Sequence, residues 1–286
     1  MRQAGNAVVT GSSSGLGREL ARQLVLERGM TVLATARRLD RLEALASELP
    51  PGRLQVLAGD LADAEFRQRL WDQAEVMPGG VDLLVNNAGM GNYSDFTMQD
   101  TQAIRQIIEL NIVALIDLSQ KAARHMKARG SGQILEISSV LGFFGIRDSA
   151  VYAASKHAVN GLVKSLRYEL HGTGVRVWAA CPARTASEFR QVALAERGAE
   201  VGRLPVGEPT ENVVRAIVRG LDRRSAFVLP SWRAWLVTNV ACWLPGPFDW
   251  MCCRWSPGSY KKVLYDPASN PAGREQASGA RAPHAS

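Results

Sequence analysis

A tyrosine and a lysine stand four residues apart at Tyr152 and Lys156, in the stretch Y-A-A-S-K. If this stretch is helical, as its surroundings predict, the phenol and the amine share one helical face. Tyrosine is a weak acid, with a reference pKa of about 10, and a nearby ammonium group is expected to lower that pKa. The pair therefore predicts acid–base chemistry, in which Tyr152 gives a proton to a substrate oxygen.

Two more polar residues are candidates for the same site. Ser139 follows an apolar run, and its hydroxyl could hydrogen-bond a substrate oxygen as charge develops there. Asn111 lies within a long helical pattern. Each residue has an ordinary alternative: an exposed pair on a helix, a hydroxyl at a strand end, or a polar residue within a helix. Their occurrence together favours a catalytic set of Asn111, Ser139, Tyr152 and Lys156.

A glycine-rich turn near the start of the chain predicts a nucleotide site. Residues 8–17 read V-V-T-G-S-S-S-G-L-G, a short apolar strand followed by glycines and then a helical run. Such a turn brings backbone N–H groups and a helix N-terminus close to a pyrophosphate. The alternative is an ordinary Ser/Gly turn at a helix start. The expected cofactor contacts in this turn are Gly11, Ser12, Ser14, Gly15, Leu16 and Gly17.

The end of the second predicted strand indicates which cofactor is preferred. A site for NAD usually has an acidic residue there, whereas this chain has Ala36 followed by Arg37 and Arg38. A guanidinium group pairs with a 2′-phosphate and stacks on adenine, so we expect Arg37 to bind NADP(H). The alternative is that both arginines are solvated residues that open the next helix.

The third and fourth strands are followed by further candidates. Asp60, with Leu61 after it, could accept a hydrogen bond from the adenine amino group, or it could cap a helix. Asn87, Ala88 and Gly89 close the fourth strand, where small residues let the chain pass near a flat ligand. A simple Asn/Gly turn is the alternative.

Alternation of apolar strands and amphipathic helices predicts the fold. Strands are expected at residues 7–10, 31–36, 54–58, 82–86, 133–138, 175–180 and 226–229, and helices at residues 16–26, 39–49, 102–127 and 149–171. This order is typical of a Rossmann-like, doubly wound parallel sheet of about seven strands in a three-layer α/β/α arrangement. Ligands then bind beyond the carboxyl ends of the strands, near the point where strand order reverses.

These motifs, in this order, resemble the short-chain dehydrogenase/reductase family over residues 7 to about 230. The resemblance implies an NADPH-dependent oxidoreductase that interconverts a carbonyl and an alcohol. It also implies that Asn111 holds a water linked to Lys156, and that Tyr152 and Lys156 touch the cofactor. The family's Pro-Gly is Pro182-Ala183 here, and Ser187 takes the place of a threonine that holds the carboxamide. The alternative is a non-catalytic regulatory scaffold that binds NADP(H).

Composition narrows the partners. The net charge is +7, but no basic run is interleaved with aromatic residues, so nucleic acid is not an expected partner. The four cysteines form no C-x-x-C and the histidines lack metal-ligand spacing, so no metal site is expected. We expect a small-molecule substrate, a homodimer or homotetramer, and a cytoplasmic protein without a signal peptide.

The C-terminal part differs from the rest. Five of the seven tryptophans lie between residues 231 and 265. We expect a catalytic domain over residues 1–230, a Trp-rich extension packed on it over residues 231–265, and a disordered tail over residues 266–286. Residues 231–244, if helical, would carry their large side chains on one stripe. The uncharged stretch 234–248 is shorter than the roughly 20 residues that span a bilayer, and it is interrupted by Pro245-Gly246-Pro247. The stripe could pack on the sheet or a second subunit, wall an apolar pocket, or touch a membrane peripherally; the last two favour a lipophilic substrate. The stripe residues are Trp232, Trp235, Leu236, Val240 and Trp243.

Overall fold

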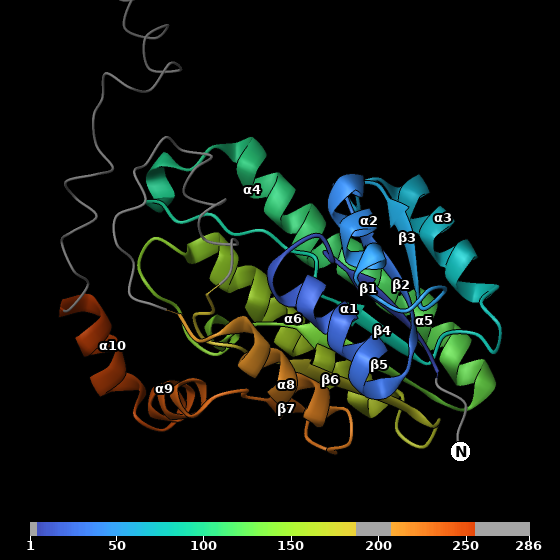
Figure 1. Cartoon of the computed structure of the whole chain (residues 1–286). Coiled ribbons are helices and arrows are strands. Elements are labelled where there is room, and N and C mark those ends of the chain that lie inside the picture. The colour runs from blue at the N-terminus through green and yellow to red at the C-terminus, as the bar shows by residue number, and fades with distance from the viewer. Residues whose placement is uncertain (1–4, 187–206, 255–286) are drawn as a thin grey trace, which may run out of the picture.

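The computed structural model describes residues 5–186 and 207–254. Its strands form one parallel sheet of seven, in the order β3-β2-β1-β4-β5-β6-β7 (Figure 1). The chain builds outward from β1 to β3 and then returns to β4 beside β1, so strand order reverses between β1 and β4. The predicted Rossmann-like sheet is confirmed. The strands are β1 Asn6–Thr10, β2 Thr31–Ala36, β3 Leu54–Ala58, β4 Leu83–Asn86, β5 Gly132–Ile137, β6 Val175–Ala180 and β7 Phe227–Val228.

Helices cover both faces of the sheet. The described helices are α1 Gly15–Arg28, α2 Leu39–Ser47, α3 Ala64–Glu75, α4 Thr101–Ile108, α5 Ala114–Arg129, α6 Ala150–Glu169, α8 Thr210–Gly220, α9 Trp232–Trp243 and α10 Pro245–Arg254. Side chains of a strand alternate between the two faces, so Val9 joins the apolar core under α1, α2 and α8, while Val8 joins the core under α3, α5 and α6. Burial on both faces is typical of an all-parallel sheet.

The single helix expected at residues 102–127 is interrupted. Between α4 and α5 lies a π-helical turn, η2 Glu109–Val113, with the fully buried Asn111 at its centre. A π turn widens the helix by one residue and is frequent at functional sites. The buried amide of Asn111 hydrogen-bonds groups outside its own helix, which a regular helical pattern does not anticipate.

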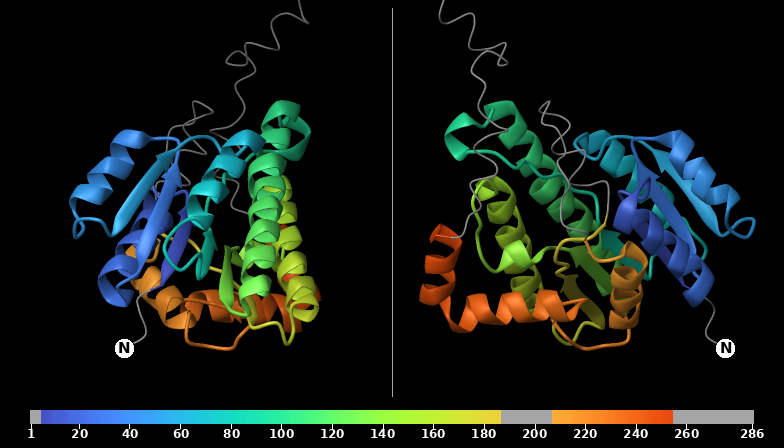
Figure 2. Two further views of the ribbon diagram at one scale, coloured as in Figure 1. Left: turned by 90° about the vertical axis from the view of Figure 1, so that its right-hand side faces the viewer. Right: turned by 60° about the vertical axis from the view of Figure 1, so that its left-hand side comes forward.

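Helices α9 and α10 follow the last strand and lie along one edge of the molecule (Figure 2). Small residues of α9 face the protein: Ala234, Thr238 and Ala241 are buried, and Ala234 joins a small apolar cluster with residues that follow β5 and with α6. Phe248 of α10 packs edge-on against Phe144, with ring centroids 4.9 Å apart. None of the described helices is long and apolar enough to cross a membrane.

Candidate active site

The carboxyl end of β5 and the first turn of α6 bring three predicted residues together. Ser139 follows β5 directly and begins the short turn η3 Val140–Gly142. Tyr152 and Lys156 are both buried, at 7% and 5% exposure. The Lys156 Nζ donates a hydrogen bond to the carbonyl oxygen of Ile137 over 2.8 Å, and it lies 5.7 Å from the centre of the Tyr152 ring. Ser139 lies close enough to Tyr152 for its side chain to oppose the rise in the pKa of the phenol.

The two adjacent serines have different partners. The Ser138 hydroxyl donates to Asn160 Oδ1 over 2.7 Å and so ties β5 to the middle of α6. The Ser139 oxygen accepts a hydrogen bond from the Leu141 N–H over 3.2 Å, which leaves its O–H directed elsewhere. Successive residues of an extended chain point to opposite sides, and Ser139 is the one that faces Tyr152.

Asn111 reaches the same place from the π turn. Its Oδ1 accepts from the Met90 N–H over 2.9 Å, while its Nδ2 donates to the Met90 carbonyl over 2.8 Å and to Ser155 Oγ over 3.1 Å. Gly89 lies between Asn111 and Lys156: a Cβ placed there would be 3.2 Å from Asn111 Oδ1 and 3.8 Å from Lys156 Nζ. The four predicted catalytic residues therefore come from three segments, η2, the end of β5 and α6, and meet at one edge of the sheet.

Burial determines the protonation of the tyrosine and the lysine. Burial raises the pKa of Tyr152 well above its ordinary value, the nearby Tyr93 raises it further, and the Ser139 hydrogen bond opposes the rise. Burial lowers the pKa of Lys156 to about 8, against the opposing effect of Glu136 and Cys181. The sequence predicts that Lys156 lowers the pKa of Tyr152; in the protein alone desolvation prevails, and the ammonium is directed at Ile137. The phenol is thus neutral and can donate a proton.

A buried carboxyl group that sequence reasoning missed lies beside this set. Glu136 in β5 is fully buried, and its Oε1 accepts from Ser119 Oγ over 2.7 Å and from Asn86 Nδ2 over 3.2 Å. Burial raises the pKa of Glu136 to about 7, opposed by those hydrogen bonds and by the charge of Lys156. The signal in the sequence is a single charged residue inside the apolar strand I-L-E-I.

The glycine turn is packed too closely against its neighbours to admit side chains. Gly11 has a φ of 69°, and a Cβ there would lie 2.9 Å from Ala88 Cα. A Cβ on Gly17 would collide with the Gly11 carbonyl oxygen, so the third glycine lets α1 pack against the turn. Thr10 Oγ1 accepts from the N–H groups of Asn87 and Ala88 over 3.0 and 2.9 Å, which joins β1 to the segment after β4. A strand, a glycine turn and a helix N-terminus in this order are typical of a dinucleotide site, and we call this turn the glycine cradle.

The polar groups of this turn make hydrogen bonds within the protein. The Ser12 hydroxyl donates to Val9 O over 2.8 Å and the Ser12 N–H donates to Thr35 O over 3.1 Å, so the protein itself occupies both donors. Arg38 instead reaches over the turn and donates to Ser13 Oγ and Ser14 Oγ over 3.0 and 3.1 Å. Arg37, the predicted ligand of a 2′-phosphate, is exposed. Ser13 and Arg38 are therefore candidates that the sequence prediction left out.

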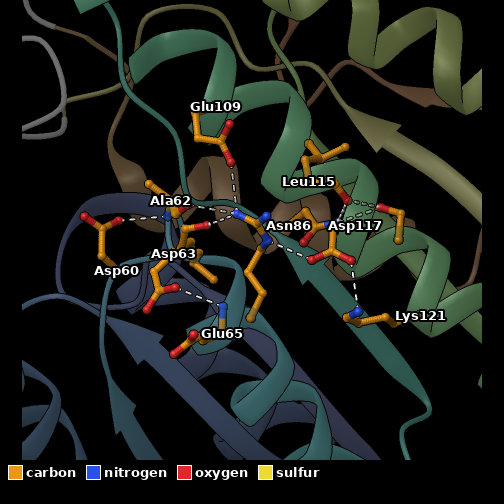
Figure 3. Close-up of polar contacts among 12 residues, drawn as sticks. Asp60, Ala62, Asp63, Glu65, Asn86, Glu109, Leu115, Asp117 and Lys121 are labelled. Atoms are coloured by element: carbon orange, nitrogen blue, oxygen red, sulfur yellow. Dashed lines mark hydrogen bonds and ion pairs between the residues drawn. The ribbon is translucent and has the colours of Figure 1, made fainter. Parts of the chain in front are cut away.

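The segment after β3 holds its own turn. Asp60 Oδ1 accepts from the Ala62 N–H over 2.9 Å, and Asp63, rather than Asp60, is the N-cap of α3 (Figure 3). Asp60 is exposed, whereas the Leu61 side chain is buried in the core. The Leu61 carbonyl accepts from the buried Arg67 over 2.7 Å. Ser187 lies outside the described residues, and within residues 5–186 and 207–254 no three His, Cys, Asp or Glu side chains gather to hold a metal ion.

Comparison with known proteins identifies the family. The model of the short chain dehydrogenase family matches residues 5–198, and the chain belongs to this family. A farnesol dehydrogenase from Aedes aegypti is 39% identical over 178 residues, covering 60% of this chain and 72% of that protein. A 3alpha-hydroxysteroid dehydrogenase from Mediterraneibacter gnavus is 34% identical over 187 residues, covering 64% and 74%. A solved short-chain dehydrogenase from Sphingobium yanoikuyae in complex with NADPH superposes with a TM-score of 0.74 at 29% identity, covering 87% of this chain and 95% of that chain.

Family membership confirms the predicted class of enzyme. The protein is an oxidoreductase that acts on CH–OH groups of small molecules and interconverts carbonyl and alcohol with a nicotinamide cofactor. The predicted fold and the predicted family are both confirmed.

Proposed function

We propose that this protein is an NADP(H)-dependent oxidoreductase for a lipophilic carbonyl or alcohol, with Ser139, Tyr152, Lys156 and Asn111 as its catalytic residues. The observation that carries the proposal is that the buried side chains of Tyr152, Ser139 and Lys156 lie close together beside the glycine cradle. Three segments converge there, although each side chain alone has an ordinary structural alternative.

Preference for NADP(H) is supported by charge at the end of β2. Ala36 brings no carboxylate to the place where one would repel a 2′-phosphate. Arg38 is held on the turn by Ser13 and Ser14, and the exposed Arg37 precedes it. A guanidinium group held by hydrogen bonds is already oriented, so it loses less conformational entropy on binding a phosphate. We assign the 2′-phosphate to Arg37 and Arg38 together.

The catalytic residues divide the work of the reaction, in which the bound cofactor supplies or accepts the hydride. In reduction, the Tyr152 O–H bond breaks and its proton goes to the substrate oxygen. The Ser139 hydroxyl donates a hydrogen bond to the same oxygen while negative charge develops on it. Lys156 provides positive charge next to the phenol, and Asn111 positions Met90 and the turn after β4. Burial keeps Tyr152 protonated, as a proton donor must be.

A lipophilic substrate is supported by the neighbours of Tyr152. Val140, Leu141 and Ala153 form an apolar cluster with it, and the Tyr93 ring lies 6.1 Å from the Tyr152 ring. Two relatives carry names with apolar substrates, farnesol and a hydroxysteroid. The side chains of Val140, Leu141 and Ala153 are buried, so they give the proton donor apolar surroundings in which substrate hydrocarbon would be shielded from water.

Steady-state kinetics tests the proposal. We expect oxidation of NADPH with ketones and aldehydes, and kcat/KM should rise as hydrocarbon is added to the substrate. NADH should be the poorer cofactor, and Arg38→Ala should weaken NADPH binding by about 10- to 100-fold while leaving NADH nearly unchanged. Leu39→Ala, which removes an exposed neighbouring side chain without changing charge, is the control. Binding of NADPH without turnover of any carbonyl would favour the regulatory scaffold, and equal affinity for NADH would contradict the cofactor assignment.

A further inference from the structure

Helix α9 carries its large apolar side chains on the solvent side. Ala234, Thr238 and Ala241 face the protein, whereas Trp232, Trp235 and Trp243 are 69%, 58% and 80% exposed. Helix α10 repeats the pattern, because Phe248 is buried while Trp250 is 65% exposed and Met251 is 41% exposed. In a helix that packs only on its own protein, large apolar side chains face the core and small or polar ones face solvent. We call the outward residues of the two helices the tryptophan face: Trp232, Trp235, Leu236, Trp243, Leu244, Trp250 and Met251.

A groove with basic walls adjoins this face. A cavity of about 320 Å³ lies between α8 and the start of α9, lined by Arg219, Arg223, Leu229, Trp232 and Trp235 among others. Both arginines are exposed, and none of the described carboxylates pairs with either of them. The groove therefore combines two cationic side chains with two indole rings that also belong to the tryptophan face.

The charge around the tryptophan face has the same sign. Arg233 lies over the Trp232 ring at 5.5 Å, and Arg254 lies over the Trp250 ring at 5.6 Å. Asp249 is the one acidic residue between residues 231 and 254. Tryptophan is favoured at the boundary between water and hydrocarbon, and arginine beside it is favoured near anionic headgroups.

We propose that α9, α10 and the adjoining groove form a docking surface for an anionic phospholipid bilayer, with the tryptophan face at the lipid interface and Arg219 and Arg223 on lipid phosphate. A second copy of the chain fits this surface less well. A two-fold contact would bring together two copies of the same positively charged patch, with too little negative charge to balance them. A bilayer instead supplies hydrocarbon for the indoles and phosphate for the arginines at once.

Docking in this way would bring the bilayer close to the candidate active site. Ala234, on the inner side of α9, belongs to the same apolar cluster as Tyr152. The opposite side of that helix would rest on lipid. A substrate dissolved in the membrane would therefore reach the enzyme at a neighbouring surface, although the docking itself does not depend on the reaction.

Vesicle sedimentation of the full chain tests the proposal without any turnover. We expect the protein to sediment with vesicles of phosphatidylcholine and phosphatidylglycerol and to bind more weakly to vesicles of phosphatidylcholine alone. Trp235→Ser with Trp243→Ser should abolish sedimentation, and Arg219→Gln with Arg223→Gln should weaken it by about tenfold or more. Inorganic phosphate should displace the protein from the vesicles no better than chloride does at the same ionic strength, because the surface binds a lipid and not free phosphate.

Matched variants distinguish docking through this surface from non-specific adsorption to vesicles. Tyr168→Ser removes a side chain that is 82% exposed on α6, and Arg69→Gln with Arg124→Gln removes the same charge from exposed positions on α3 and α5. Both controls should bind vesicles as the parent protein does, and circular dichroism should show that every variant is folded. A parent protein that stays in the supernatant with both vesicle types would overturn the proposal. So would a tryptophan variant that binds normally, or controls that lose binding equally.

Discussion

Tyr152 is the residue on which the proposed chemistry depends most directly. Tyr152→Phe removes one hydroxyl from a buried ring and leaves the packing with Val140 and Leu141 in place. We expect the temperature of unfolding and the affinity for NADPH to stay nearly constant, while kcat falls by about 10²- to 10⁴-fold because the proton donor is lost. Stopped-flow or steady-state measurement of NADPH oxidation checks this. A variant that keeps near-normal turnover would show that another group supplies the proton.

Glu136 is the residue that should make stability depend on pH. Burial raises its pKa from 4.5 in the unfolded chain to about 7 in the folded protein. The folded state then binds the Glu136 proton more tightly, so the contribution of Glu136 to the free energy of unfolding is largest at low pH and falls as pH rises from 4.5 to about 7. Lys156, whose charge faces Glu136, has its pKa lowered only to about 8 and therefore titrates above this window.

The variant Glu136→Gln removes this titration and keeps the shape of the side chain. We expect the advantage of the variant over the parent, measured by urea unfolding, to grow by about 2 kcal/mol between about pH 5 and about pH 7.5. Glu27→Gln, at an exposed position on α1, is the matched control and should show no comparable change. An advantage for Glu136→Gln that stays constant with pH would mean that Glu136 ionises in the folded protein as it does in water.

At the scale of elements, Arg67 joins α3 to the interrupted helix that carries Asn111. Its guanidinium donates to Asp117 over 2.7 Å and to Glu109 over 3.1 Å, and it also donates to the carbonyl groups of residues 61 and 62 (Figure 3). Arg67 is only 5% exposed, so its cation is shielded from water, while the side chains of Asp117 and Glu109 are 25% and 38% exposed. The arrangement holds η2 against the end of β3.

Loss of this guanidinium group should therefore be costly. We expect Arg67→Ala to lower the free energy of unfolding by about 3 kcal/mol, because two carboxylates and two carbonyls lose a common donor. Arg69→Ala, two residues further along α3 at an exposed position, should change stability by less than about 1 kcal/mol. Thermal or urea unfolding of the two variants side by side decides the matter, and equal effects would refute a structural role for the buried network.

At the scale of the whole molecule, α9 and α10 complete the core beside the candidate site. A chain that ends at Pro230 loses Ala234 from the cluster around Tyr152, and it loses Phe248 from its contact with Phe144. We expect the free energy of unfolding to fall by about 2–3 kcal/mol from the loss of the phenylalanine alone. Turnover should also be reduced. A chain that ends at Arg254 keeps both helices and is the control. If the shorter chain unfolds at the same temperature and keeps its activity, the helices contribute nothing to the catalytic core.

Oligomeric state is the other property of the whole molecule that stays a prediction. We expect a homodimer or homotetramer. Light scattering coupled to size-exclusion chromatography would measure it directly.

Much of the fold could be predicted because its signals are local. Strands at residues 31–36, 54–58 and 175–180 lie where apolar β-formers are bounded by turn residues, and the structure places β2, β3 and β6 there. The glycine turn, Ser139 and the Tyr152–Lys156 pair were found in the same way, since strand ends and helix spacing bring them to one edge of a parallel sheet. Their chemical roles stay predictions that the kinetic experiments test.

Tertiary structure decided the features that depend on contacts between distant segments. The pKa of Tyr152 rises because several segments exclude water from the phenol, and no neighbour in sequence could indicate this. Arg38, rather than Arg37, reaches the glycine turn because β2 ends beside β1. The same is true of the tryptophans: helical spacing placed them on one stripe, but only the packing of small residues against the body turned that stripe outward. Local pattern sets which residues share a face, whereas the direction of that face depends on the rest of the chain.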